Sequence, residues 1–322
     1  MGFNPHEPIT FDAVSRSAVR NAMDANQPLL QAATPVIQSL TRAMANTRYF
    51  AILTDASGLV IDVNGPVDRH NPQASSIARV GVDLSERAVG TTAIGATLAE
   101  LQPVWLHRGE HFFDATSVYS CAGAPIWGPD GQCVGMLDLT GVNVVEQPAL
   151  KHLVIQSARS IENALALARP HRLLLSLNWP GQTLGGDSDG LVCVDADGQI
   201  TALNRPAADM LGIVAGMAPG HCTDVFAVSL ESLFDAARVL RPAMEVPLWS
   251  GLRLNVHAQF NSGGERTPMQ GVGAAVPLKD VETALIRKAV ENARGNVMEA
   301  ARALGISRAT VYRKLMRRKS GG

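Results

Sequence analysis

The stretch CAGAPIWGPDGQCVGMLDLTG, residues 121–141, contains two apolar runs of β type separated by the residues GPDG at 128–131. Gly, Pro and Asp favour tight turns because they supply the backbone angles and local hydrogen bonds that a turn requires. The stretch therefore predicts a pair of strands over 120–127 and 132–141, joined across this turn.

The sequence on both sides of this pair predicts further strands and several helices. Short apolar runs bounded by turn residues indicate strands, and apolar residues spaced three and four apart indicate helices. The expected elements are two helices within 10–46, a hairpin of strands at 51–55 and 59–64, a loop and helix at 83–100, a strand at 103–107 and an amphipathic helix at 148–169.

A second set of elements follows a predicted boundary at Pro170 and residues 178–187, where Pro and Gly are frequent and apolar periodicity is lost. We expect a hairpin of strands, a short helix that Asn204 caps, another helix and three more strands, which together describe a small α+β domain. The expected ranges are strands at 191–195, 199–204, 243–249, 252–260 and 270–278, and a helix at 228–240.

Composition favours packed domains without a membrane or disulfide framework. The 322 residues suffice for two or three domains, and 46% of them are hydrophobic against 18% charged. The sequence contains no apolar run of about 18 residues and no signal-peptide pattern, so we expect a cytoplasmic protein without membrane contact. Its four cysteines are widely spaced without a CxxC pair, so neither a disulfide framework nor a metal site is predicted.

The C-terminal tail is basic although the chain as a whole has a net charge of −1. From Lys279 to Gly322 there are 11 Lys or Arg and 4 acidic residues, which gives +7 and leaves −8 for the rest of the chain. Two helices at 280–294 and 297–304 precede Gly305 and a third helix that Ser307 caps. The exposed face of the last helix predicts contacts with double-stranded DNA. Its candidate residues are Ser307, Arg308, Thr310, Arg313, Lys314 and Arg317.

Two segments resemble known families. The segment LIRKAVENARGNVMEAARALGISRATVYRKLMRR, residues 285–318, resembles the Fis-type helix-turn-helix of many sigma-54-dependent activators. Residues 84–112 and 121–141 resemble the GAF domain of the acetoin and glycerol-metabolism regulators, and residues 189–212 resemble the beginning of a PAS domain. The resemblance implies an α+β chain with a GAF domain, a PAS-like domain and a small all-α Fis-type helix-turn-helix.

The expected domains are N-terminal helices at 1–46, a GAF sensor at 47–170, a PAS-like domain at 186–277 and the helix-turn-helix at 279–322. Fis-type domains bind as dimers, so the resemblance implies a homodimer on a palindromic operator. The apolar stripe of the helix at 148–169 is expected to relay the state of the GAF domain and to pair with its copy in the dimer.

A GAF domain implies a small-molecule effector between its sheet and the elements that cover one face. Aromatic walls with a few oriented polar groups are typical of such pockets. The candidate effector-binding residues are Trp105, His111, Phe112, Phe113, Cys121, Asp138 and Thr140. Plain core packing of these side chains is the alternative. We expect no cofactor, and Cys121 remains open as a redox or nitric oxide sensor.

The sigma-54-dependent activators place an ATPase between sensor and helix-turn-helix, whereas this sequence has no GxxxxGK[ST] phosphate loop and no GAFTGA loop. We therefore expect regulation by operator occupancy without ATP hydrolysis, with RNA polymerase as a further candidate partner. The alternative is a co-regulator that dimerises with a full-length activator and antagonises it. An enzyme is not expected, because no catalytic set of carboxylates, metal ligands or activated nucleophile is found.

Overall fold

The computed structural model describes residues 4–7, 9, 11, 14–214, 220–239, 243–261 and 297–298. The chain divides into two compact units, residues 1–261 and residues 262–322. The predicted strand at 270–278 and the DNA-contacting residues of the predicted helix-turn-helix belong to the second unit and lie outside the described residues.

The first unit begins with a five-stranded antiparallel sheet in the order β2-β1-β5-β4-β3. Its strands are β1 (Tyr49–Asp55), β2 (Val60–Asn64), β3 (Val104–His107), β4 (Tyr119–Trp127) and β5 (Cys133–Val142). The pair predicted from residues 121–141 is confirmed as β4 and β5, in which Cys121 is opposite Thr140 and Gly123 is opposite Asp138. The predicted hairpin is confirmed as β1 and β2.

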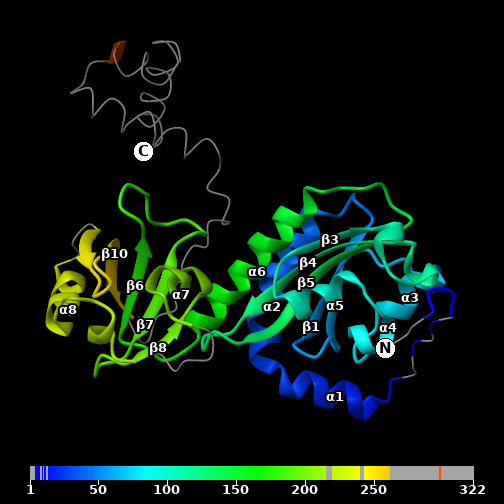
Figure 1. Cartoon of the computed structure of the whole chain (residues 1–322), viewed down its shortest axis with the longest axis horizontal. Helices are drawn as coiled ribbons and strands as arrows, with labels where there is room; N and C mark the ends of the chain where they lie inside the picture. Colours follow the sequence, from blue (N-terminus) through cyan, green and yellow to red (C-terminus); the bar gives the residue numbers. More distant parts are fainter. Residues whose placement is uncertain are drawn as a thin grey trace, which may run out of the picture. The chain divides into compact units, whose positions relative to one another are not determined.

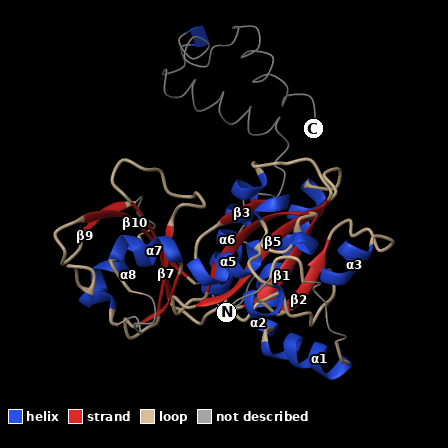
Figure 2. Cartoon of the chain, turned by 45° about the vertical axis from the view of Figure 1, so that its right-hand side comes forward, coloured by secondary structure: helices blue, strands red, loops and turns tan. Residues whose placement is uncertain are grey.

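Helices cover both faces of this sheet (Figures 1 and 2). The N-terminal helix α1 (Arg16–Ala25) leads into α2 (Gln27–Ala43), and α2 packs with α6 (Leu150–Leu167) on one face. The opposite face is covered by α3 (Pro72–Ile77), α4 (Glu86–Val89) and α5 (Ala93–Glu100), together with the short helices η1 (Arg108–Glu110) and η2 (Asp114–Thr116) in the loop between β3 and β4.

Strand β5 shows why both faces are closed. Side chains alternate between the faces of a strand, so Leu137 and Leu139 lie in the core under α2 and α6, whereas Met136, Asp138 and Thr140 point to the face under α5. Every one of these side chains is buried. The sheet therefore needs an apolar cover on each side.

The second sheet of the first unit has the order β8-β7-β6-β10-β9. Its strands are β6 (Leu173–Asn178), β7 (Gly190–Val194), β8 (Ile200–Leu203), β9 (Met244–Pro247) and β10 (Arg253–Phe260). Strand β6, with the sequence LLLSLN, lies at the centre between β7 and β10. The predicted boundary left this strand outside both domains.

One face of the second sheet is covered by α7 (Arg205–Leu211) and α8 (Leu230–Arg238), while η3 (Cys222–Asp224) contributes the buried side chain of Cys222. Asn204 caps α7 as predicted, since its Oδ1 accepts the N–H of Ala207 at 3.0 Å and that of Leu191 at 2.8 Å. Its Nδ2 donates to the carbonyl of Asp189 and to Asn163 of α6.

Helix α6 belongs to both cores. Most of its buried residues pack with α2 on the first sheet, but Ala166 and Leu167 pack on the second sheet beside Leu174 and Cys193. Most of the apolar stripe that the sequence assigns to a dimer contact is therefore covered by α2 and the two sheets, whereas Leu153 is 37% exposed. None of the helices in the described part of the chain is long and apolar enough to cross a membrane.

We predict that Asn204→Ala lowers the free energy of unfolding by about 2 to 3 kcal/mol, because it removes a helix cap and leaves buried donors and an acceptor unpaired. Urea unfolding at neutral pH measures this loss. Ser229→Ala is the matched control, since Ser229 caps α8 from an exposed position. That substitution should cost less, at about 1 kcal/mol. Equal losses in the two variants would show that the buried hydrogen bonds of Asn204 add no stability beyond that of a helix cap.

Candidate functional site

A cavity lies between the first sheet and the elements that cover its second face. Its empty space is about 360 Å³, including the part open to solvent. Strands β1, β4 and β5 form the floor, and α4, α5 and the loop at 108–117 form the walls. The lining residues are Phe11, Ile52, Ile77, Leu84, Val89, Thr92, Ala93, Ile94, His111, Thr116, Tyr119, Cys121 and Thr140.

A chain of buried polar groups runs through the floor. The hydroxyl of Thr140 donates to a carboxyl oxygen of Asp138 in a short hydrogen bond. The oxygen of Thr140 is then free to accept from the thiol of Cys121, whose sulfur lies 3.3 Å away. Burial and the nearby Asp138 raise the pKa of Cys121 well above its usual value. The thiol is therefore neutral at neutral pH and can donate its hydrogen bond to Thr140.

Among these hydrogen-bonded groups, the side chain of Asp138 is fully buried. Its Oδ1 has no hydrogen-bond partner among the described residues, and the same is true of Oγ1 of Thr97 on α5. Both groups lie around Gly123, which is opposite Asp138 in the sheet; a Cβ at Gly123 would come within 2.6 Å of Thr97 Oγ1. Burial raises the pKa of Asp138 to about 7, and the hydrogen bond from Thr140 opposes this shift.

His111 supplies an acceptor on the wall of the cavity. Its Nδ1 lies 2.9 Å from the carbonyl oxygen of Arg108, so Nδ1 carries the proton and Nε2 is an acceptor when the ring is neutral. Burial lowers the pKa of His111, which favours the neutral ring at neutral pH. Its Nε2 is buried without a partner in the part of the chain that the structure describes. A ligand hydroxyl or amide N–H can satisfy this atom.

The structure brings His111, Cys121 and Thr140 together on the cavity surface, with Asp138 next to them beneath it. Trp105 lies elsewhere: it packs with the core on the α2 and α6 side, and its indole N–H points to Glu146 at 3.4 Å. Phe112 is 40% exposed. Phe113 is buried against Phe112, with the ring centroids 4.9 Å apart, and is absent from the lining.

The sequence analysis did not predict that residues of α4 and α5, or Phe11, line the cavity. Thr92 is the N-cap of α5 and Ala93 and Ile94 start this helix, so three lining residues come from one helix end. Strand alternation was a usable signal for Ile52, because it lies directly opposite Asp138 on the neighbouring strand β1. Among the described residues no group of three His, Cys, Asp or Glu side chains could hold a metal ion.

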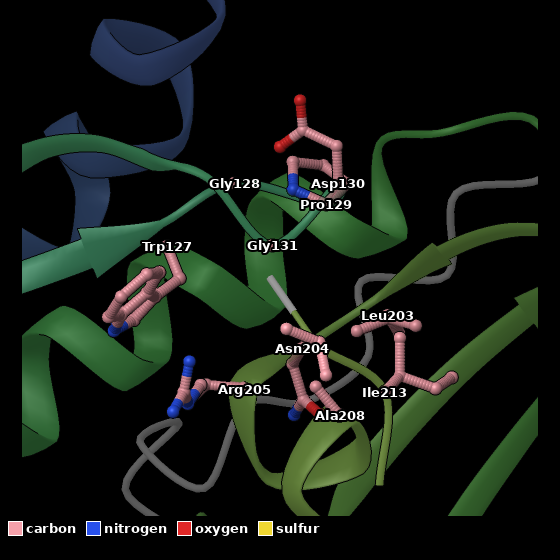
Figure 3. A pocket seen from close by; sticks show the side chains of 11 residues that line it. Trp127, Gly128, Pro129, Asp130, Gly131, Leu203, Asn204, Arg205, Ala208 and Ile213 are labelled. Carbon is pink, nitrogen blue, oxygen red and sulfur yellow. The ribbon is translucent and has the colours of Figure 1, made fainter. Parts of the chain in front are cut away.

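A second feature joins the two sheets of the first unit (Figure 3). The turn after β4 meets the start of α7, where the N–H of Leu203 donates to the carbonyl of Pro129 at 3.2 Å. The guanidinium of Arg205 lies 4.6 Å from the ring centroid of Trp127, which is a cation–π distance. The residues of this junction line a second pocket, whose empty space of about 360 Å³ includes open solvent.

Glu162 of α6 lies at the base of this junction. Its Oε1 accepts the backbone N–H of Trp127 at 3.1 Å, and the residue is only 4% exposed. Burial raises the pKa of Glu162 to about 7, whereas the Trp127 hydrogen bond and the cations of Arg159 and Arg205 act in the opposite direction. Helix α6 is thus connected by hydrogen bonds to the end of β4 through Glu162 and to the N-cap of α7 through Asn163.

An antiparallel five-stranded sheet with helices on both faces and a partly polar cavity under one of them defines a GAF-like domain. Residues 7–163 match the family described as MimR, N-terminal domain, and residues 277–317 match the Bacterial regulatory protein, Fis family. The N-terminal half of the chain thus matches a domain family of transcription regulators, and its C-terminal segment matches the Fis family that the sequence predicts.

Several curated relatives are named as transcription regulators. The acetoin catabolism regulatory protein of Cupriavidus necator is 32% identical over 207 residues, which are 62% of this chain and 30% of that relative. The propane 2-monooxygenase operon transcriptional activator MimR of Mycolicibacterium smegmatis is 29% identical over 48% of this chain and 27% of its own length. The chain thus covers less than a third of these relatives. The crystal structure of the E. coli DhaR(N)–DhaL complex aligns with a TM-score of 0.47 and 14% identity, over 79% of this chain and 94% of that one.

We predict that Asp138 makes the protein less stable as pH rises. Its pKa is raised in the folded state to about 7, above its value of about 3.9 in the unfolded chain, so unfolding releases a proton between these pH values. The stability of the native protein should fall by a few kcal/mol relative to Asp138→Asn as pH rises from about 4 to 7, and the difference should level off above pH 7.

Urea unfolding at a series of pH values measures this difference. Glu162→Gln is the matched control, because Glu162 has a pKa raised to the same region but lies at the junction between the sheets. Its effect should add to that of Asp138→Asn in the double variant. Parallel stability curves for the native protein and Asp138→Asn would contradict a neutral Asp138 at the cavity floor.

Proposed function

We propose that the chain is a transcription regulator that binds an operator through its Fis-family segment and a small uncharged effector through the cavity of its GAF-like domain. The match of residues 277–317 to the Fis family supports the DNA-binding half of the proposal. In the basic tail the side chains assigned to DNA are Ser307, Arg308, Thr310, Arg313, Lys314 and Arg317. A homodimer would place two recognition helices on a palindromic site.

The effector is proposed from the chemistry of the cavity. Its walls are mostly apolar, and the polar groups on its surface include the neutral thiol of Cys121, the hydroxyl of Thr140 and the neutral ring of His111. An ionic ligand would lose its hydration without gaining a counterion there. A small oxygenated molecule instead offers a hydroxyl to His111 Nε2. The names of two relatives mention acetoin catabolism and a propane 2-monooxygenase operon, which agrees with a small uncharged effector.

The proposed mode of action is operator occupancy without ATP hydrolysis, because the sequence has no phosphate loop of the GxxxxGK[ST] type. Helix α6 is the proposed relay within the first unit, since it packs on both sheets and carries Glu162 at their junction. The second sheet, predicted from the sequence as PAS-like, then receives the signal through Asn163 and Asn204.

We predict that Arg313→Ala and Lys314→Ala each weaken retention of selected DNA about tenfold, within the range of about 1 to 3 kcal/mol for a lost base contact. A substitution that removes a phosphate contact should also reduce the slope of log affinity against log salt by about 1. The experiment selects fragments of the bacterial genome on the purified full chain and then measures their affinity by electrophoretic mobility shift.

Arg16→Ala is the control for this measurement, because it removes an equal charge from an exposed position on α1. Its DNA affinity should equal that of the native chain. Selective DNA retention by a chain that ends at residue 278 would contradict the proposal. DNA retention that requires a second, ATPase-bearing protein would instead favour the co-regulator that antagonises a full-length activator.

We predict that acetoin, used as a small uncharged hydroxyketone probe, raises the melting temperature of the native protein and that His111→Ala abolishes this rise. The physical reason is the loss of the acceptor at Nε2. Differential scanning calorimetry measures the shift. Phe112→Ala is the control, since Phe112 is outside the lining, and this variant should keep the native response. A response retained in His111→Ala would show that the ring does not contact the probe.

A further inference from the structure

Arg108 contacts both the cavity wall and the chain that leads into α6. Its carbonyl oxygen accepts the backbone N–H of His111 at 3.1 Å and lies 2.9 Å from Nδ1 of the same residue. Its guanidinium Nη2 donates to the carbonyl of Val144 at 3.3 Å. One residue therefore connects the ring of His111 with the segment between β5 and α6.

The connector, defined here as residues 143–149 between β5 and α6, is a firm point of attachment. The side chain of Val144 is only 4% exposed and belongs to the core that α2 and α6 share. The hydroxyl of Tyr49 on β1 donates to the carbonyl of Val145 at 3.1 Å, next to the carbonyl that Arg108 contacts. The guanidinium of Arg108 is thus bonded to a segment that the sheet and the core already hold in place.

The backbone of Arg108 has a φ of 50°, in the left-handed region that residues with a side chain rarely adopt. Such a conformation is strained, and other contacts must offset its cost. The bond from Nη2 to Val144 is one such contact. A second is made by Glu110, whose Oε2 accepts the N–H of His107 at 2.5 Å across the turn η1. Because the backbone angles of Arg108 direct its carbonyl, the acceptor for His111 depends on this strained turn.

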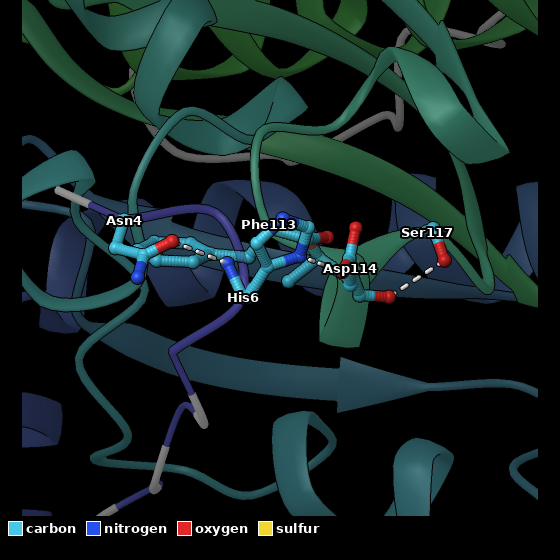
Figure 4. A network of polar contacts seen from close by, with 6 residues as sticks. Asn4, His6, Phe113, Asp114 and Ser117 are labelled. Carbon is cyan, nitrogen blue, oxygen red and sulfur yellow. Dashed lines mark hydrogen bonds and ion pairs between the residues drawn. The ribbon is translucent and has the colours of Figure 1, made fainter.

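The second half of the loop between β3 and β4 has hydrogen bonds of its own (Figure 4). The hydroxyl of Ser117 donates to the carbonyl of Asp114 at 2.6 Å, and the hydroxyl of Thr116 donates to the carbonyl of Phe113 at 2.8 Å. Nδ1 of His6 lies 2.6 Å from Oδ2 of Asp114. These bonds hold η2, whereas the polar contacts of the His111 ring lie in the first half of the loop with Arg108.

Two contacts act on the ring of His111, and only one of them distinguishes its two nitrogens. The ring of Tyr119 meets it edge-on, with the centroids 6.4 Å apart, and this contact does not depend on which nitrogen carries the proton. The carbonyl of Arg108 can only accept, so it requires a proton on Nδ1. Burial lowers the pKa of His111, and Nε2 of the neutral ring is then an acceptor on the cavity wall.

We propose that Arg108 is the positioning residue of the effector site: its guanidinium, bonded to the connector, holds the left-handed turn that keeps the proton of His111 on Nδ1 and leaves Nε2 as an acceptor. The site then selects a molecule that donates a hydrogen bond to this nitrogen. This inference deepens the proposed function and rests on it for the role of the cavity, but the state of the ring is tested without any effector.

Arg108 also couples the effector contact to the connector. A donor that binds Nε2 polarises the ring and strengthens the hydrogen bond from Nδ1 to the carbonyl of Arg108, since bonds in a chain reinforce one another. Coupling of this kind is reciprocal, so a contact that holds Arg108 in place also favours binding at Nε2. The bond from Arg108 to Val144 thus belongs to the effector site although it lies outside the cavity lining.

Long-range proton–nitrogen NMR spectra of the full chain with ¹⁵N-labelled histidine test the proposal at neutral pH. They show which nitrogen of each ring is protonated, and a His111→Gln variant identifies the signals of His111. We expect Nδ1 to be protonated in the native chain. Arg108→Ala should lower the ratio of the Nδ1–H to the Nε2–H tautomer about fivefold, as expected for the loss of one hydrogen bond. Arg108→Lys keeps a donor on a long side chain and should restore most of the native ratio.

The chain offers an internal reference and a matched control variant. Nε2 of His221 lies 2.9 Å from the carbonyl oxygen of Asp197, so this ring has the opposite tautomer and reports on the second sheet region. Arg79 also donates from its guanidinium to a backbone carbonyl, that of Ser76 at 3.2 Å, from an exposed position. Arg79→Ala should leave both rings in their native state.

A native tautomer ratio at His111 in Arg108→Ala would overturn the proposal. An equal change at His221 would also overturn it, because it indicates a general loss of structure. A changed ratio that Arg108→Lys does not restore would assign the effect to the backbone alone and refute the role of the guanidinium. If the native chain binds neither DNA nor acetoin while Arg108→Ala still shifts the tautomer, the proposed function fails and the positioning role stands.

Discussion

Strand β5 is paired on both edges and covered on both faces, and its residues 135–142 are buried, so their side chains must be accommodated without water. Leu137 and Leu139 meet this condition by packing under α2 and α6. Asp138 does not, and its burial is tolerable only because Thr140 donates to one carboxyl oxygen and the pKa rises to about 7. The polar floor of the cavity is a direct result of this one constraint, since Cys121 completes the chain of hydrogen bonds on β4.

The sequence was sufficient to predict the paired strands, the long helix α6 and the cap of α7, because each depends on neighbouring residues. The turn GPDG and the cap Asn204 act within a few positions of where they stand. Strand β6 was missed because its leucines follow a helix closely and precede a segment rich in Gly. The cavity was predicted in part: His111, Cys121 and Thr140 share it, while Trp105 faces the other core. Strand alternation shows that Trp105 and Cys121 lie on opposite faces of the sheet, but only once the register between β3 and β4 is known.

Helix α6 illustrates a limit of patterns along the chain. A continuous apolar stripe is expected both of a helix that pairs with a second copy and of a helix that packs on two sheets in succession. Here the buried residues of the stripe between Leu150 and Leu165 pack on α2 and the first sheet, and Ala166 and Leu167 pack on the second. The contacts of Glu162 and Asn163 with Trp127 and Asn204 add the polar specificity that fixes this arrangement. Of the apolar residues of this stripe, Leu153 is left 37% exposed.

A ligand changes the balance between two states only through a difference in its affinity for them. The buried acceptor of His111 belongs to the loop between β3 and β4, whereas the oxygen of Thr140 belongs to the sheet. A molecule that contacted Thr140 alone would bind equally whatever the position of the loop, and it would carry no signal. A molecule that reaches both groups binds best when the loop holds His111 over the sheet. The contact with His111 is thus the contact through which the proposed effector can act as a signal.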